Sequence, residues 1–144
     1  MTSHSLLSIA ACLLSAGCTT LAGKPTAFSS CSFEQVWDAS VAALSDFPVQ
    51  TIDKAAGALE TNWIEVDAST QAGALQRDVN RERVKYVVEV RPDGRGTAAI
   101  VAQLREEWSP MGVQSRQWRA IPGNPSEEEA LASAITKRLK EKGC

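Results

Sequence analysis

The chain has 144 residues, a formal net charge of −2, 44% apolar residues and 22% charged residues, which is typical of one globular domain. This nearly balanced charge excludes a basic nucleic-acid binder and an acidic disordered tail. No run of about 18 apolar residues exists that could form a membrane-spanning helix.

The N-terminus has the pattern of a cleaved export signal. Residues 6–14 form a short apolar run, and the small residues 15–17 precede Cys18. This pattern resembles the signal of bacterial lipoproteins, in which the cysteine is acylated and becomes the mature N-terminus. The resemblance implies a lipid at Cys18, and Thr19 after it implies the periplasmic face of the outer membrane. An ordinary secretory signal cleaved just ahead of Cys18 is the alternative, and it also predicts export.

The predicted organisation is a signal peptide over 1–17, a lipidated tether over 18–30 and one folded domain over 31–144. Removal of the signal also removes His4, the single histidine of the sequence. We therefore predict no catalytic residues, no enzyme activity, no cofactor and no metal site.

Two cysteines, Cys31 and Cys144, remain after Cys12 is cleaved off and Cys18 is acylated. An oxidising periplasm allows one disulfide between them, which would close a loop of more than 100 residues. Two unpaired thiols are the alternative, because a sequence does not give the separation of the two Cα atoms.

A capping box marks the start of the first helix. The Ser32 hydroxyl is expected to accept from the backbone of Gln35, whose side chain reaches back. Apolar residues then recur at helical spacing, and Pro48 is expected to end the helix near Asp46. These apolar residues are Phe33, Val36, Trp37, Val41, Leu44 and Phe47.

Strand patterns fill the middle of the chain. A short strand over 49–52, a turn over 53–57 and a strand over 58–66 predict a hairpin, and a polar loop follows over 67–82. Period-two alternation then predicts a central hairpin of two strands, 84–90 and 97–108, joined by a turn. Its core-facing residues are expected to be Val84, Tyr86, Val88 and Val90, then Ala98, Ile100, Ala102, Leu104 and Trp108. Short extra strands are possible at 27–30 and 114–121.

Residues that favour helix ends mark both the start and the end of the predicted final helix. Asn124 can cap it, Pro125 suits its first position, and Gly143 can end it. Its charges and its narrow apolar stripe fit a helix packed on a sheet. The acidic start has Glu127, Glu128 and Glu129, the basic end has Lys137, Arg138, Lys140 and Lys142, and the stripe has Ala130, Leu131, Ala134, Ile135 and Leu139.

The predicted fold class is α+β, with an antiparallel sheet of four to five strands and both helices on one face. We interpret the tryptophans as core residues: Trp37, Trp63, Trp108 and Trp118. Glu106 falls on the same side of its strand as Ile100 and Trp108, so it is expected to need a partner such as an arginine, or a bulge that turns it outward.

Several segments resemble the BamC family of lipoproteins. They are FEQVWDA at 33–39, TIDKAAGALETNW at 51–63, RERVKYVV at 81–88, GRGT at 94–97 and QWR at 117–119. The similarity spans roughly residues 29–142. It implies a helix-grip fold and an accessory, protein-binding role in the outer-membrane β-barrel assembly machinery, without catalysis. This chain has one such domain and a short tether, whereas BamC has two domains and a long N-terminal segment.

We therefore expect an outer-membrane lipoprotein that acts as a protein-interaction or accessory module. Its partners would be envelope proteins, among them possible β-barrel assembly components, and its membrane contact would be made through lipid. The predicted interaction surface comprises Trp118, Arg77 and Arg81.

The sequence favours this function over two alternatives. A carrier of an apolar ligand would need a cavity between the last helix and the sheet, which Trp37, Trp63 and Trp108 are expected to fill. The second alternative is glycoside hydrolysis by a pair of carboxylates, for which several acidic residues are candidates. The favoured interpretation is that these residues lie on solvent-exposed surfaces and have no catalytic role. These are Asp53, Glu60, Glu65, Asp67, Glu106 and Glu107.

Overall fold

A computed structural model describes residues 25–28, 30–68, 80–94, 96–110 and 116–144. Within them the chain forms seven strands and two helices, so the α+β class is confirmed, whereas the prediction of four to five strands is wrong. In chain order the elements are β1 (Pro25–Phe28), α1 (Phe33–Ala43), β2 (Val49–Asp53), β3 (Ala58–Thr61), β4 (Ile64–Val66), β5 (Arg81–Asp93), β6 (Gly96–Trp108), β7 (Trp118–Ile121) and α2 (Pro125–Glu141).

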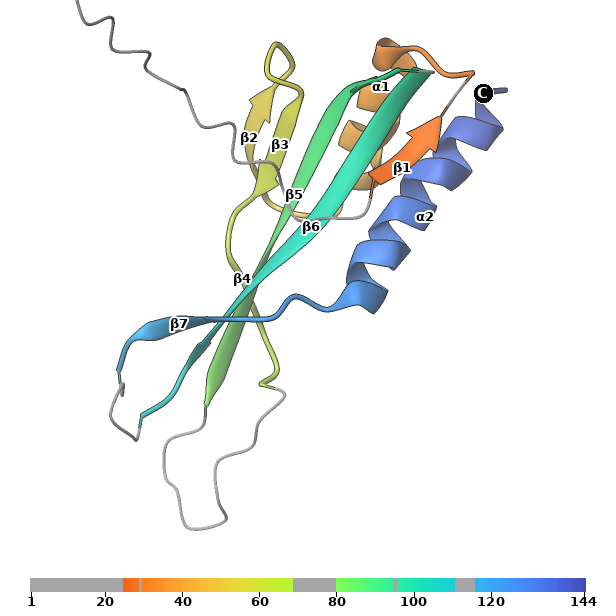
Figure 1. The fold of residues 1–144 in the computed structure, drawn as a ribbon. Coiled ribbons are helices and arrows are strands. Elements are labelled where there is room, and N and C mark those ends of the chain that lie inside the picture. Colours follow the sequence, from red (N-terminus) through yellow and green to blue (C-terminus); the bar gives the residue numbers. More distant parts are fainter. Residues whose placement is uncertain (1–24, 29, 69–79, 95, 111–115) are drawn as a thin grey trace, which may run out of the picture.

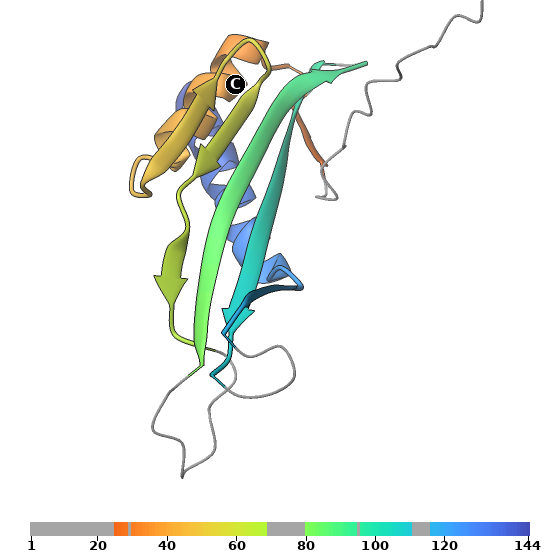
Figure 2. The same cartoon turned by 90° about the vertical axis from the view of Figure 1, so that its left-hand side faces the viewer.

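All seven strands belong to one antiparallel sheet with the order β1-β6-β5-β3-β2. The long hairpin of β5 and β6 runs through its whole length, and β4 and β7 pair with the far ends of β5 and β6. Both helices pack against the same face of the sheet, and the opposite face is here called the outer face (Figures 1 and 2). The end that contains β4 and β7 extends beyond the helices.

The strands differ from the prediction in four places. β1 covers Pro25–Phe28, inside the range assigned to the tether, so the folded body begins before residue 31. The strand expected over 58–66 is interrupted between Thr61 and Ile64. Of the last strand, expected over 114–121, residues 114 and 115 lie outside the described residues, and β7 covers Trp118–Ile121. β5 begins at Arg81, which lies inside the expected polar loop.

α1 begins where the capping box predicted. Ser32 Oγ accepts from Gln35 N at 3.3 Å, and Gln35 Oε1 accepts from Ser32 N at 2.8 Å. The helix ends earlier than expected, at Ala43, because Leu44 already leaves helical geometry and Phe47 N turns back to Leu44 O. The predicted end near Asp46 is therefore wrong by one turn.

α2 also begins as predicted. Asn124 Oδ1 accepts from Ser126 N at 3.1 Å, and Pro125 takes the first helical position. Leu131, Ile135 and Leu139 are buried, whereas Ala130 at the edge of the predicted stripe is exposed.

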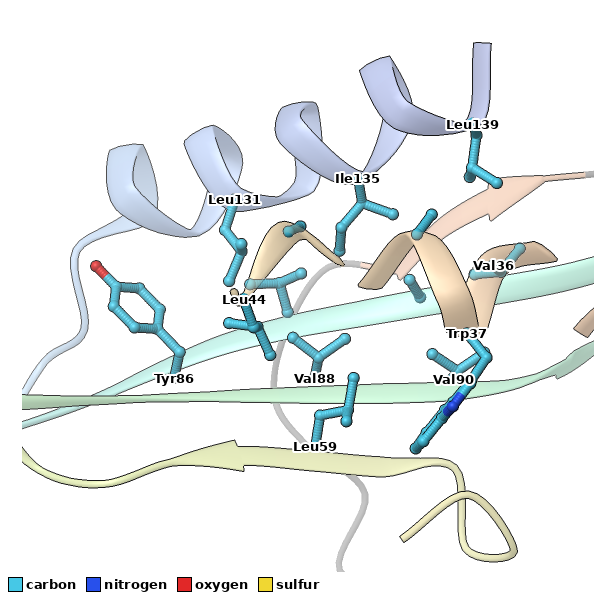
Figure 3. Close-up of a cluster of buried hydrophobic side chains, with 14 of the residues drawn as sticks. Val36, Trp37, Leu44, Leu59, Tyr86, Val88, Val90, Leu131, Ile135 and Leu139 are labelled. Atoms are coloured by element: carbon cyan, nitrogen blue, oxygen red, sulfur yellow. The ribbon is translucent and has the colours of Figure 1, made fainter. Parts of the chain in front are cut away.

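The core lies between the two helices and the sheet (Figure 3). α1 contributes Val36 and Trp37, and α2 contributes Leu131, Ile135 and Leu139. Their partners on the sheet include Leu59, Tyr86, Val88 and Val90 from β3 and β5, together with Ala99 and Val101 from β6.

The prediction for β6 is wrong about which face packs on the helices. The even-numbered residues were expected to face the core, but they lie on the opposite face. Val88 pairs with Val101 and Val90 pairs with Ala99, so the odd-numbered residues of β6 face the helices. Ala98, Ile100 and Ala102 lie on the outer face and are also buried, while Leu104 there is 44% exposed. A strand that is apolar on both faces has no clear period, so its register with β5 decides which residues reach the core.

Candidate functional site

Two tryptophans and three cations stack along the outer face of the sheet. The guanidinium carbon of Arg83 lies 4.2 Å from the ring centre of Trp118 and 4.5 Å from that of Trp63. Arg81 lies 5.7 Å from Trp118, and Lys85 Nζ lies 5.5 Å from Trp63. Each ring thus contacts two neighbouring cations of β5. We call these five residues, Arg81, Trp118, Arg83, Trp63 and Lys85, the cation–tryptophan stack.

Local structure explains how side chains from three parts of the chain meet. Alternation along β5 places Arg81, Arg83 and Lys85 on the outer face, because Glu82 and Val84 between them are buried on the inner face. Trp118 reaches the same face from β7, where it pairs with Trp108 of β6.

Trp63 reaches the outer face because the chain is irregular between β3 and β4. Thr61 is buried, and its Oγ1 accepts from Tyr86 N at 3.0 Å and donates to Asn62 O at 2.9 Å. The side chain thus provides the acceptor for a backbone N–H of β5 at the point where the strand pairing stops. Asn62 N is bonded to Pro48 O at 2.7 Å, which fixes the next residue, Trp63, over β5.

The cations of the stack are each paired with a carboxylate. Arg83 Nε bonds to Glu106 Oε2 at 2.7 Å, Lys85 Nζ lies 3.5 Å from Glu60 Oε2, and Arg81 pairs with Glu65. Arg83 is the centre of the arrangement, and its side chain is 25% exposed, compared with 49% for Arg81 at the end. The positive charges of the stack are therefore compensated by an equal number of carboxylates, and contacts with neighbouring side chains hold the cations in place.

The predicted interaction residues are partly brought together. Trp118 and Arg81 are in contact in the stack, whereas Arg77 and the proposed lipid site Cys18 lie outside the described residues. Sequence reasoning missed Arg83, Lys85 and Trp63 as members of the same surface. The alternation of β5 already indicated that both cations face away from the core, but no local signal indicates which aromatic residues lie beside them.

Three tryptophans are not core residues, contrary to the prediction. Trp37 is buried, at 4% exposure, but Trp63, Trp108 and Trp118 are half-buried. Trp63 and Trp118 contact cations on the outer face, and Trp108 pairs there with Trp118 and Arg81. Glu106 lies on this face too, where its predicted arginine partner is Arg83.

A second polar cluster fixes the start of α2 on the sheet. Gln103 Nε2 donates to the Tyr86 hydroxyl at 3.2 Å, and Gln103 Oε1 accepts from Asn124 N at 2.8 Å. Glu128 Oε1 accepts from Gln103 N at 2.9 Å, and the Tyr86 hydroxyl donates to Glu127 Oε2 at 3.3 Å. Burial raises the pKa of Tyr86 above its usual value; the nearby Glu127 charge raises it further, and the Gln103 hydrogen bond partly offsets this.

Cys31 and Cys144 are joined by a disulfide, with their Cα atoms 5.5 Å apart. The bond connects the residue ahead of α1 to the residue that follows α2, 113 positions later. It therefore links the two helices at one end of the body, far from β7 (Figure 1).

The space between α2 and the sheet is filled by aliphatic side chains, among them Leu44, Val88, Leu131 and Ile135. Trp63 and Trp108, which were expected to fill it, lie outside it. A cleft of about 330 Å³ opens between β1 and α2, and its lining mixes apolar and polar side chains. The polar side chains are Thr26, Glu128, Glu129, Ser133 and Thr136.

Four of the carboxylates considered for catalysis form ion pairs. Glu60 pairs with Lys85, Glu65 with Arg81, Glu106 with Arg83 and Glu107 with Arg119. Across the described ranges, no three His, Cys, Asp or Glu side chains are grouped as metal ligands. Neither described helix has the length and apolar content that crossing a membrane requires.

No protein-family model and no curated protein sequence matches this chain. The resemblance to the BamC family therefore stays a prediction.

Proposed function

We propose that this protein is an exported lipoprotein, acylated at Cys18 and held at the periplasmic face of the outer membrane. Its folded body acts as a non-catalytic interaction module, and the cation–tryptophan stack is the surface that receives an envelope protein. This proposal keeps the role that the resemblance to BamC implies, namely an accessory component beside a larger assembly.

Two properties of the cation–tryptophan stack support its role as a binding surface, namely its residue types and its rigidity. Tryptophan and arginine are the residues that contribute most binding energy in protein interfaces. Here Arg83 is held between two rings and by Glu106, so little side-chain entropy would be lost when a partner binds. The stack also lies on the outer face. Figure 2 shows both helices behind the sheet, on the opposite face.

The disulfide supports export. Disulfides form and persist in oxidising compartments such as the periplasm and are rare in the cytosol. The bond between Cys31 and Cys144 therefore agrees with the export signal at the N-terminus.

A carrier of an apolar ligand receives less support. Such carriers bury the ligand in an enclosed, mostly apolar cavity, whereas the cleft beside β1 mixes Val101, Pro125 and Ala132 with hydroxyl and carboxylate groups.

The anchor is tested by cell fractionation of a Cys18→Ser variant. Loss of the acyl chains is expected to move the protein from the membrane fraction to the periplasmic fraction, because neither described helix is long and apolar enough to cross a bilayer. Cys12→Ser is the matched control and should stay with the membrane. Membrane retention of Cys18→Ser contradicts the anchor.

The docking surface is tested by crosslinking and pull-down from gently solubilised envelopes. We expect a Trp118→Ala variant to lose its partner, and Asp38→Ala, an exposed change on α1, to keep it. Recovery of β-barrel assembly components would support the role implied by BamC. Equal recovery by both variants contradicts the assignment of this surface.

A further inference from the structure

The C-terminal end of α2 carries a cluster of positively charged side chains. Residues 136–144 contain four cations and one acidic side chain, Glu141. Within the described parts of the chain, no ion pair joins any of the four cations to a carboxylate. Three of them are exposed and Arg138 is half-buried. We call Lys137, Arg138, Lys140 and Lys142 the basic end of α2.

Cations at a helix C-terminus complement the helix dipole, so charge alone does not identify a binding site. The position of β1 provides the second observation. Thr26 of β1 lines one cleft with α2 residues from Pro125 to Thr136, so β1 lies alongside α2, and Figure 1 shows β1 running toward the C-terminal end of the helix. The disulfide between Cys31 and Cys144 then joins the chain beyond α2 to a residue three positions after β1. The basic end therefore lies near the C-terminal end of the four-residue strand β1, whose first residue, Pro25, connects the N-terminal segment to the sheet.

The length of that segment places the membrane within reach. Under the proposed acylation of Cys18, six residues separate the lipid from Pro25, the first residue of β1. The seven Cα–Cα steps from Cys18 to Pro25 span at most about 24 Å. The tether was expected to extend to residue 30, and its shortening by β1 holds this end of the body close to the bilayer.

The cation–tryptophan stack lies at the other end of the molecule. Its central residue, Arg83, pairs with Glu106, whereas Pro25 pairs with Ile100. The two positions are separated on β6 by a distance on the order of 20 Å. α2 starts beside Gln103 and runs away from the stack, so its basic end is still farther from it (Figure 1).

We propose that the basic end of α2 binds the phosphate groups of anionic lipids in the membrane that holds the acyl chains of Cys18. This contact orients the body with the stack directed away from the bilayer, toward a partner. The inference rests on the proposed acylation, because without it the basic end is not held at a membrane. Each cation near an anionic surface is expected to contribute about fivefold to the local binding equilibrium.

The test uses the full chain, expressed with its N-terminal signal in a bacterium and purified in detergent, and the same protein reconstituted into lipid vesicles. An amine-reactive reagent labels the lysines, and mass spectrometry gives the labelling rate of each. We expect Lys137, Lys140 and Lys142 to be labelled about fivefold more slowly in vesicles of phosphatidylethanolamine with phosphatidylglycerol than in detergent. Lys85 in the stack is the internal control and should keep its rate.

Two further measurements separate this contact from simple proximity to lipid. Protection should weaken in vesicles of phosphatidylethanolamine alone and at high salt, because screening weakens exposed charge interactions. A Lys137→Gln/Lys140→Gln variant should stay in the vesicles through its acyl chains while Lys142 loses protection.

Three outcomes overturn the proposal. Equal labelling of the three lysines in detergent and in anionic vesicles excludes the contact, and equal protection in both lipid mixtures excludes a role for anionic phosphate. If the chain is not retained in vesicles, the proposed acylation is contradicted. The proposed orientation of the body at the membrane is then contradicted as well. Retention and labelling are separate readouts, so the two failures are distinguishable.

Discussion

The guanidinium of Arg83 lies between the rings of Trp63 and Trp118, 4.5 Å from one ring centre and 4.2 Å from the other. Trp63 comes from the irregular connection between β3 and β4, and Trp118 comes from β7. One side chain of β5 thus links the strands on both sides of the central hairpin, at the end of the sheet that extends beyond the helices.

This position makes Arg83 more important for stability than an ordinary surface arginine. Replacement of Arg83 by methionine is expected to lower the free energy of unfolding by about 1–2 kcal/mol, because two cation–π contacts are lost. Glu106 also loses its arginine partner. Urea unfolding measures the change. Arg91→Met is the control, since Arg91 lies 3.7 Å from Glu89 in a weak surface pair, and should stay within about 0.5 kcal/mol. Equal losses in both variants contradict the special role of the stack.

Gly57 is required by the turn between β2 and β3. Its φ is +68°, and a Cβ added there would lie 2.1 Å from the carbonyl oxygen of Val90. Gly57→Ala is expected to cost more than about 2 kcal/mol of unfolding free energy, because the backbone of β5 must move. Gly94→Ala is the matched control, with no heavy atom within 4 Å of the added Cβ. Thermal unfolding compares the two, and similar melting temperatures would contradict the assignment.

The disulfide should stabilise the body mainly by restricting the unfolded chain. The bond spans 113 positions, for which the chain-entropy model gives about 4–5 kcal/mol. Cys144→Ser is expected to lower the free energy of unfolding by up to this amount. A Cys31→Ser/Cys144→Ser double variant should match the single variant, and wild type in reducing buffer should match both. Unchanged stability of wild type on reduction would contradict the prediction.

The raised pKa of Tyr86 predicts a loss of stability at high pH. Burial keeps the phenol protonated in the folded protein above pH 10, where it ionises in the unfolded chain. The unfolded state then binds fewer protons, so the free energy of unfolding falls as pH rises from about 10 toward the folded pKa. Below that window the contribution is fully present.

Tyr86 is the single tyrosine of the sequence, so near-ultraviolet absorbance reports its ionisation directly. Urea unfolding at several pH values should show a steeper decline in wild type than in Tyr86→Phe. Parallel declines in the two proteins would indicate that other groups cause the alkaline loss.

Local chemistry made the helix starts predictable. Ser32 with Gln35 and Asn124 with Pro125 satisfy backbone groups within a few residues, so their geometry depends little on the rest of the fold. The inward face of β5 was also predicted, because Val84, Tyr86, Val88 and Val90 alternate with polar residues. The candidate site was predicted only in part, through Trp118 and Arg81.

The sequence by itself therefore determined the helix starts, the α+β class and the face of β5 that enters the core. The tertiary structure alone decided which face of β6 packs on the helices, since β6 is apolar on both faces between Ala98 and Ala102 and takes its orientation from pairing with β5. It also decided the place of Trp63 and Trp118. Their rings could have joined an apolar core, and they lie on the outer face because strand pairing brings them beside the cations of β5.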